Sequence, residues 1–238
     1  MAMSDVVIAG VGGQGTVLAS KLLANAALLE GRAVRTAETI GMAQRGGSVL
    51  GHVRISKASA FGGARAGSHS ELAMSPLVSV GSADVLLGFE PAEAVRALPL
   101  VRAGGLVVTA TQVMVPAAVA GGAGAGGAAG SGSRKATTAR STYDGAAELA
   151  WLKACQAQGR LGNLVLVDGA AACAALGSPK VLNVVLLGAV LATGVLEVSA
   201  QSVLAALETM VKPAFLSLNR DALQLGMNML LSEGKNQA

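Results

Sequence analysis

Cysteine is scarce in this sequence of 238 residues, which contains only Cys155 and Cys173. They lie far apart, without a CxxC spacing or a flanking histidine, and we predict free buried thiols. The pattern therefore indicates neither a disulfide nor a metal site. Because iron–sulfur clusters generally need four thiolates, this chain cannot hold such a cluster by itself.

Aromatic and charged side chains are also few, at 2% and 13% of the residues, against 52% hydrophobic residues. The core must therefore consist mainly of alanine, valine and leucine, with glycines that let backbones approach one another. So few charges are typical of a protein that covers part of its surface with a partner, and equally of an alanine-rich genome. The net charge is +4, but no run of lysine and arginine and no interleaved aromatic residues favour nucleic-acid binding.

Apolar runs long enough to cross a membrane are missing as well. The uncharged stretch 103–133 is interrupted by Pro116, and 181–196 is shorter than the roughly 20 residues that a spanning helix needs. At the N-terminus, Asp5 precedes an apolar run too short for a secretory signal. We therefore expect a cytoplasmic protein without membrane attachment.

Short apolar runs alternate with amphipathic stretches along the chain. Strands are expected at 5–10, 33–37, 49–55, 83–87, 105–111 and 164–167, and helices at 16–29, 91–98, 148–158, 170–176, 181–193, from Ser199 or Ser202, and from Pro213 to Leu230. This order predicts an α/β fold, in which a single Rossmann-like domain over 1–231 has a mixed, mostly parallel sheet and helices on both faces. Residues 49–55 alternate between apolar and polar, which favours an antiparallel strand. The Gly/Ala-rich stretch 117–133 predicts a flexible insertion, and 232–238 a disordered tail.

The first motif is a glycine-rich turn between the first strand and the first helix. Gly10, Gly12 and Gly15 form a GxGxxG pattern, with Gly13 and Gln14 at its variable positions. Such a turn lets the backbone approach a phosphate at a helix N-terminus, and Glu38 follows the second strand where a ribose-binding carboxylate would lie. Two interpretations stay open: a dinucleotide site, or a tight junction that binds nothing.

The second motif, GMAQRGGS at 41–48, combines polar side chains with consecutive glycines. Arg45 can bind a carboxylate or phosphate with its guanidinium fork, and Gln44 and Ser48 add an amide and a hydroxyl. The N–H groups of Gly46 and Gly47 can contribute to an anion-binding concavity. The alternative is a loop that only turns the chain.

No self-contained active site is evident, so we expect no catalytic and no metal-binding residues in this chain. His52, on the polar face of a strand, and His69, in a Ser/Gly loop, are expected to be solvated or interfacial. Asp84, Glu90 and Asp168 lie at strand ends and are expected to serve as cap or turn residues. No nucleophile elbow, P-loop lysine or HExxH pattern occurs.

Taken together, GVGGQG, VRTAE, GMAQRGGSVLGHVRI, ADVLLGFEPAEAVRAL and SPKVLNVVLLGAV resemble the gamma-type subunits of 2-oxoacid:ferredoxin oxidoreductases. Within that family, the chain is most similar to the small subunits of the indolepyruvate branch. The resemblance spans most of the chain and leaves the insertion at 117–133 outside.

The resemblance implies a division of labour with a large (alpha) subunit. That subunit would hold thiamine diphosphate and 4Fe–4S clusters and would decarboxylate the 2-oxoacid, which the resemblance implies to be indolepyruvate or another arylpyruvate. Coenzyme A would accept the acyl group and ferredoxin the electrons, giving acyl-CoA, CO2 and reduced ferredoxin. The present chain would hold none of these cofactors alone.

By the same resemblance, the family-marked residues line the surface that faces the partner and the channel for coenzyme A or substrate. They are Gly12, Gly13, Gln14, Gly15, Gln44, Arg45, Gly46, Gly47 and Ser48. Asn183 also matches, as a helix or interface residue. Two alternatives remain: a free-standing NAD(P)-binding oxidoreductase that uses the glycine turn and Glu38, and a noncatalytic assembly subunit.

Overall fold

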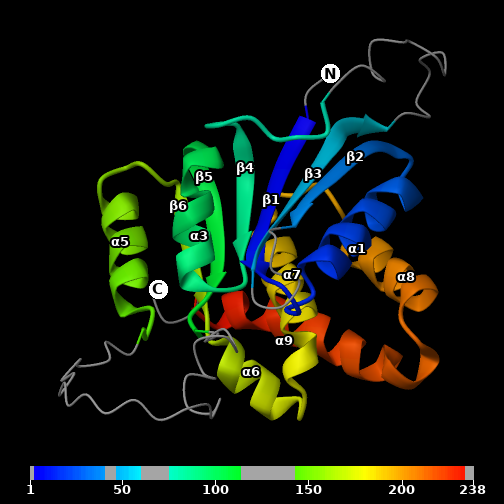
Figure 1. Ribbon diagram of the computed structural model, residues 1–238. Coiled ribbons are helices and arrows are strands. Elements are labelled where there is room, and N and C mark those ends of the chain that lie inside the picture. The colour runs from blue at the N-terminus through cyan, green and yellow to red at the C-terminus, as the bar shows by residue number, and fades with distance from the viewer. Residues whose placement is uncertain (1–2, 41–46, 60–74, 114–142, 234–238) are drawn as a thin grey trace, which may run out of the picture.

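The computed structural model describes residues 3–40, 47–59, 75–113 and 143–233, which form a six-stranded sheet with helices on both faces (Figure 1). The strands are β1 (Met3–Val11), β2 (Arg32–Ile40), β3 (Ser48–Ser59), β4 (Ala83–Gly88), β5 (Val101–Ala110) and β6 (Asn163–Val167). The helices are α1 (Thr16–Leu29), α3 (Pro91–Ala97), α5 (Ala146–Ala157), α6 (Gly169–Ala175), α7 (Leu182–Ala192), α8 (Ala200–Met210) and α9 (Leu216–Glu233). Short 3-10 turns stand at Leu98–Leu100, Pro179–Val181 and Pro213–Phe215. The predicted α/β fold is confirmed.

The sheet has the strand order β2-β3-β1-β4-β5-β6 and is mostly parallel. Strands β1, β4, β5 and β6 run parallel, whereas β3 is antiparallel to both β1 and β2, as its alternating pattern predicted. Strand β2 therefore runs parallel to β1 without touching it, because β3 lies between them. The sequence indicated a simple βαβ unit made of β1, α1 and β2, but in the sheet β3 lies between the two strands of that unit.

Alternate side chains of the central strand β1 enter two different cores. Val6 and Ile8 pack with α1, α7, α8 and α9, while Val7 and Ala9 pack with α3 and α5 on the opposite face. This division follows from the period of two residues along a strand. Cys155 and Cys173 are buried free thiols, as predicted.

Polar side chains begin three helices where the sequence suggested caps. The carboxylates of Glu90 and Asp168 accept the backbone N–H groups of Glu93 and Ala171, at 3.1 and 2.9 Å, and the hydroxyl of Ser199 caps α8 in the same way.

The prediction of a disordered tail over 232–238 was wrong in part. Helix α9 continues to Glu233, so the first two residues of the predicted disordered tail are helical, because the first helix breaker after Leu230 is Gly234. The predicted insertion at 117–133 and the rest of the tail lie outside the described residues.

His52 is buried rather than solvated, which corrects the expectation from its strand face. Only 4% of its surface is exposed, and its Nδ1 accepts the backbone N–H of Val78 at 3.2 Å. The segment before β4 carries Val78 into the core on this face of the sheet and covers the histidine. The alternation within β3 could not reveal that cover, because it comes from a distant part of the chain. His69 lies outside the described residues.

Burial lowers the pKa of His52 below its ordinary value of 6.5, because the charged imidazolium loses its hydration. The unfolded chain takes up this proton near pH 6.5, whereas the folded protein takes it up only at lower pH, so folding stability must fall as the pH drops below 6.5. We expect urea unfolding to show this loss between pH 7 and pH 5. In His52→Asn, which retains an acceptor for Val78, the loss over that interval should be smaller; an equal loss would contradict the prediction.

Within the described ranges, no helix is long and apolar enough to span a membrane.

Candidate functional site

The segments that the sequence singled out meet at the carboxyl-terminal edge of the parallel strands, at the lower end of the sheet in Figure 1. The glycine turn leaves β1 there, Phe89 follows β4, and Gln112 follows β5. Strand β3 begins at this same edge because it runs antiparallel to β1. In open α/β sheets, ligands bind at this edge.

Three glycines shape the turn for different reasons. Gly13 and Gly15 have φ values of +99° and +86°, which side-chain-bearing residues rarely adopt. Gly10 has an ordinary φ, but a Cβ there would lie 2.7 Å from Cγ2 of Thr16 and 2.9 Å from Cβ of Phe89. The turn therefore depends on Gly10 for close packing against α1 and the loop after β4, and on the other two glycines for backbone conformation.

The side chain of Gln14 is turned into the protein and holds the turn closed. Its Oε1 accepts the backbone N–H of Val11 at 2.7 Å, and its Nε2 donates to the carbonyl of Phe89 at 3.3 Å. A single buried amide thus joins the end of β1 to the loop that follows β4. No rule for dinucleotide fingerprints assigns Gln14 this task, and the sequence did not predict it.

Asn183, at the start of α7, packs against Gly15 of the glycine turn. It is buried, and its Nδ2 would lie 2.7 Å from a Cβ at Gly15. The same amide nitrogen lies 3.5 Å from the carbonyl oxygen of Gly15. Asn183 is therefore a buried helix residue beneath the glycine turn, which agrees with one of its two expected roles.

The end of the second motif lies against the first. The backbone N–H of Gly12 donates to the carbonyl of Gly47 at 2.8 Å, and Ser48 Oγ donates to Oε2 of Glu93 at 2.5 Å. The other carboxylate oxygen of Glu93 pairs with Arg96. Gly47 and Ser48 thus lie beside the glycine turn, and their expected role in binding stays a prediction. Gln44, Arg45 and Gly46 lie outside the described residues, so their expected roles stay predictions.

Two buried carboxylates organise the first turn of α3 next to Ser48. Glu93 is the first, and Glu90 is the second: its Oε1 accepts the hydroxyl of Tyr143 at 2.5 Å. Burial, with the hydrogen bond to Glu90 next in importance, raises the pKa of Tyr143 well above its usual range. Sequence reasoning missed Glu93 and Tyr143. The spacing of Glu93 three residues after a helix cap was a usable signal, whereas nothing local marks Tyr143.

An open pocket of about 550 Å³ lies against the glycine turn. It is lined by Gly12, Gly13, Gly15, Thr16, Val17, Leu18, Lys21 and Val49. The first intrahelical bond joins Ala19 N–H to the carbonyl of Gly15, and α1 has neither a side-chain cap nor an acidic residue in its first turn. The early N–H groups and Lys21 therefore give this pocket a positive potential that favours an anionic ligand.

Glu38 does not line this pocket. It lies on β2, opposite Gly51 of β3, and β3 separates it from β1. In the usual dinucleotide fold the corresponding acidic residue follows the strand next to the glycine turn. Here that strand is displaced by one strand spacing, about 4.8 Å, so the geometry does not favour a ribose contact.

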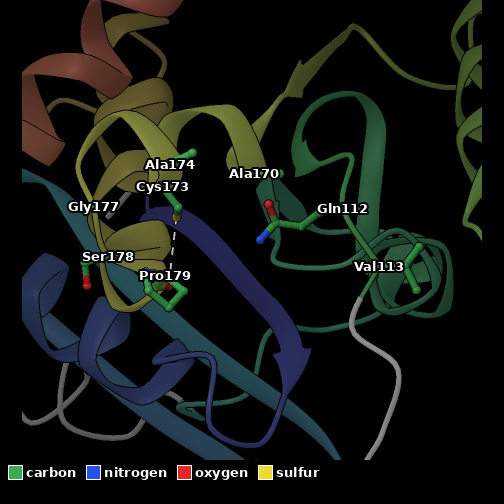
Figure 2. Close-up of a pocket in the computed structure, with 8 residues that line it drawn as sticks. All are labelled: Gln112, Val113, Ala170, Cys173, Ala174, Gly177, Ser178 and Pro179. Atoms are coloured by element: carbon green, nitrogen blue, oxygen red, sulfur yellow. Dashed lines mark hydrogen bonds between the residues drawn. The ribbon is translucent and has the colours of Figure 1, made fainter. Parts of the chain in front are cut away.

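A second pocket, of about 440 Å³, lies at the ends of β5 and β6 (Figure 2). Figure 2 shows Gln112 and Val113 on one side, facing Cys173 and Pro179 across the hollow. Burial raises the pKa of Cys173, so its thiol stays protonated at neutral pH. The Oε1 of Gln112 is buried and has no hydrogen-bond partner within the described residues. Among all the residues that the structure describes, no three or more metal-ligating side chains come together.

Comparison with known proteins decides the family. A family model described as pyruvate ferredoxin/flavodoxin oxidoreductase matches residues 5–229. The chain belongs to this family. It is 33% identical over 223 residues to the indolepyruvate oxidoreductase subunit IorB of Pyrococcus horikoshii, an alignment that covers 94% of each chain. The IorB subunit of Archaeoglobus fulgidus is 43% identical over 118 residues, which span 50% of this chain and 51% of that protein.

Solved structures share the fold of this pyruvate ferredoxin/flavodoxin oxidoreductase family member. The gamma subunit of a keto/oxoacid ferredoxin oxidoreductase from Geobacter sulfurreducens has a TM-score of 0.60 at 21% identity, over 96% of this chain and 99% of that chain. A 2-oxoglutarate:ferredoxin oxidoreductase from Magnetococcus marinus, with 2-oxoglutarate, coenzyme A and succinyl-CoA bound, has a TM-score of 0.62 at 15% identity. The latter match covers 98% of this chain but only 32% of that chain. Both identities are low, so these likenesses establish the fold alone.

Proposed function

We propose that the protein is the small subunit of a cytoplasmic 2-oxoacid:ferredoxin oxidoreductase that acts on indolepyruvate or a related arylpyruvate. Membership of the family supports the coarser part, an oxidoreductase subunit. The full-length similarity to IorB of Pyrococcus horikoshii supports the choice of the small subunit and of indolepyruvate. One observation carries the link to the site: the glycine turn lines an anion-favouring pocket, and Gly47 of the second motif accepts a hydrogen bond from Gly12 of that lining.

The redox chemistry belongs to the large subunit in this proposal. Thiamine diphosphate held there would supply the carbanion chemistry of decarboxylation, and 4Fe–4S clusters held there would supply one-electron chemistry towards ferredoxin. Two cysteines in the whole sequence agree with clusters held elsewhere, since four thiolates are generally required. The task of the small subunit is to complete the complex and to bind coenzyme A, which accepts the acyl group.

The glycine-turn pocket is the proposed contact for a phosphate group of coenzyme A. The backbone N–H groups of Gly13 and Gly15 and the ammonium of Lys21 supply donors and positive charge, whereas the N–H of Gly12 is bonded to Gly47. In the proposal Gln44, Arg45, Gly46, Gly47 and Ser48 extend this surface towards the partner, and Gln14 contributes by holding the turn. The Magnetococcus marinus enzyme was solved with coenzyme A bound, which supports this class of ligand for the shared fold.

Reconstitution of the complex tests the proposal. The tagged chain is co-expressed with the large subunit encoded in the same genome, purified, and tested with 2-oxoacids, coenzyme A and ferredoxin. We expect a brown complex whose visible absorbance bleaches on addition of an arylpyruvate and coenzyme A, with arylpyruvates preferred over pyruvate and 2-oxoglutarate. Failure of the two chains to associate would refute the subunit assignment. A preference for an aliphatic 2-oxoacid would refute only the substrate.

Reversing the charge of Lys21 tests the coenzyme A site within that complex. Lys21→Glu places a carboxylate beside the phosphate, and we expect about a tenfold increase in KM for coenzyme A, since about 1.4 kcal/mol corresponds to a factor of ten. KM for the 2-oxoacid and kcat should stay nearly unchanged. Lys212→Glu, at an exposed lysine outside the pocket, is the matched control. Equal kinetics of the two variants would favour a noncatalytic assembly role.

The dinucleotide interpretation makes the opposite prediction for the isolated chain. It requires binding of NAD(P) that weakens on Glu38→Ala. The separation of Glu38 from the glycine turn by β3 does not favour it. Calorimetric titration of the isolated chain with NAD⁺ and NADP⁺ distinguishes the two functions.

A further inference from the structure

The one tryptophan of the chain lies at the surface, and its partner Arg160 belongs to the connection that enters β6 at the amino-terminal edge of the sheet, opposite to the glycine turn. Trp151 lies on α5 and is 48% exposed. The guanidinium carbon of Arg160, in the connection from α5 to β6, lies 5.7 Å from the centre of the Trp151 ring. This cation–π contact holds two large side chains in place at the surface, so that little conformational entropy remains to be lost when a partner binds.

A shallow hollow of about 310 Å³ adjoins the pair. Its lining is mostly apolar and consists of Leu98, Pro99, Val101, Ala103, Arg160 and Leu161. The backbone N–H of Gly81 donates to the carbonyl of Pro99 at 2.9 Å, which brings Val80, 77% exposed, to the same edge. Trp151, Arg160, Val80 and the hollow form what we call the amino-edge surface.

The two arginines of this region limit which kinds of partner can bind the amino-edge surface. Arg160 makes no ion pair with any carboxylate in the described residues, and Arg102, between two lining residues of the hollow, is half-exposed although it pairs with Asp84. A second copy of the chain would bring the same cations to a symmetric contact, which like-charge repulsion disfavours. The surface therefore fits a partner that presents carboxylates around an apolar centre.

We propose that the amino-edge surface docks an acidic, partly apolar patch of the large subunit. This inference rests on the proposed function, which supplies a permanent partner. Tryptophan and arginine are the residues that most often carry binding energy at protein interfaces, and permanent interfaces are more apolar than transient ones. This contact lies at the edge of the sheet away from the glycine-turn pocket, and in the proposal the large subunit reaches both edges, since the glycine-turn surface also faces it.

Affinity of the purified subunits for each other, measured by biolayer interferometry, tests this surface with two variants. Trp151→Ala should raise Kd at least thirtyfold, the loss typical of an interface hot spot (about 2 kcal/mol or more). Arg160→Glu should raise Kd at least tenfold, and its Kd should depend less on salt than that of the wild type because an attractive charge pair is lost. Both side chains are exposed, and circular dichroism melting should show folding equal to wild type.

Matched controls are Phe215→Ala, at an aromatic side chain 53% exposed, and Lys212→Glu, both in the turn between α8 and α9. These should bind like the wild type. If all four variants bind equally, the amino-edge surface is not the docking site, although the subunit assignment survives. If the wild-type chain does not bind the large subunit, the proposed function fails and this inference fails with it.

Discussion

Replacing Gly226 by alanine is expected to destabilise the protein by about 3 kcal/mol, at the upper end of what an added methyl group costs in a well-packed interior. A Cβ at Gly226 would lie 2.0 Å from the carbonyl oxygen of Val185. Helices α7 and α9 pack backbone to backbone there, so the clash cannot be relieved by rotating a side chain. Gly188 makes the reciprocal approach from α7, with its Cβ position 2.3 Å from the carbonyl of Leu223. Urea unfolding measures the loss.

Gly177→Ala is the matched control for the Gly226 variant. Gly177 has a φ of +68°, but nothing lies within 4 Å of its Cβ position. The cost there is only that of a left-handed conformation, about 1 kcal/mol. If Gly226→Ala is no more destabilising than Gly177→Ala, the close helix contact does not contribute to stability as described.

The α7–α9 contact matters for the site because α7 carries Asn183 beneath Gly15. If α7 moves away from α9 to accommodate a methyl group, Asn183 must move towards Gly15 or lose its place under the turn. We therefore expect Gly226→Ala to disturb the glycine-turn pocket as well as the global stability. This coupling runs through one helix and needs no contact between Gly226 and a ligand.

Local patterns were sufficient for most elements of the fold. The glycine turn and the apolar spacing after it predict a helix at 16–29, which is the observed α1. Period-two alternation in 49–55 predicts the antiparallel β3. Neither pattern could show that β3 inserts between β1 and β2, because strand order depends on which distant strands pair. The burial of His52 by the segment that contains Val78 could not be predicted either, because that segment is distant in the sequence.

The sequence predicted where in the fold the candidate site lies, but not the contacts that form it. The order strand, glycine turn, helix indicates the carboxyl edge of the sheet, and there Gly12 meets Gly47. The contacts that hold this meeting come from residues far along the chain: the carbonyl of Phe89 for Gln14 and the carboxylate of Glu93 for Ser48. Long-range hydrogen bonds of this kind carry no local sequence signal.

Gln14→Met should be the most damaging conservative change at the site, because it keeps the length of the side chain and removes both of its hydrogen bonds. The N–H of Val11 and the carbonyl of Phe89 would then lack these partners in a buried position. Each buried group left unpaired costs about 1–3 kcal/mol, so we expect a loss of about 2–4 kcal/mol in the free energy of unfolding. Gln158→Met, at an exposed glutamine, should stay within about 0.5 kcal/mol of wild type.

Gln14→Glu tests the two hydrogen bonds of the Gln14 side chain separately. One carboxylate oxygen can still accept from Val11, but the other would face the carbonyl of Phe89, where the amide donated. Burial then favours the protonated acid, which restores a donor, so the variant should gain stability relative to Gln14→Met as the pH is lowered from 7 to 5. In the reconstituted complex, both variants should raise KM for coenzyme A more than they lower kcat, since they loosen the turn and leave the chemistry on the large subunit intact. A change in stability without any change in that KM would mean that the turn shapes the fold and does not hold the ligand.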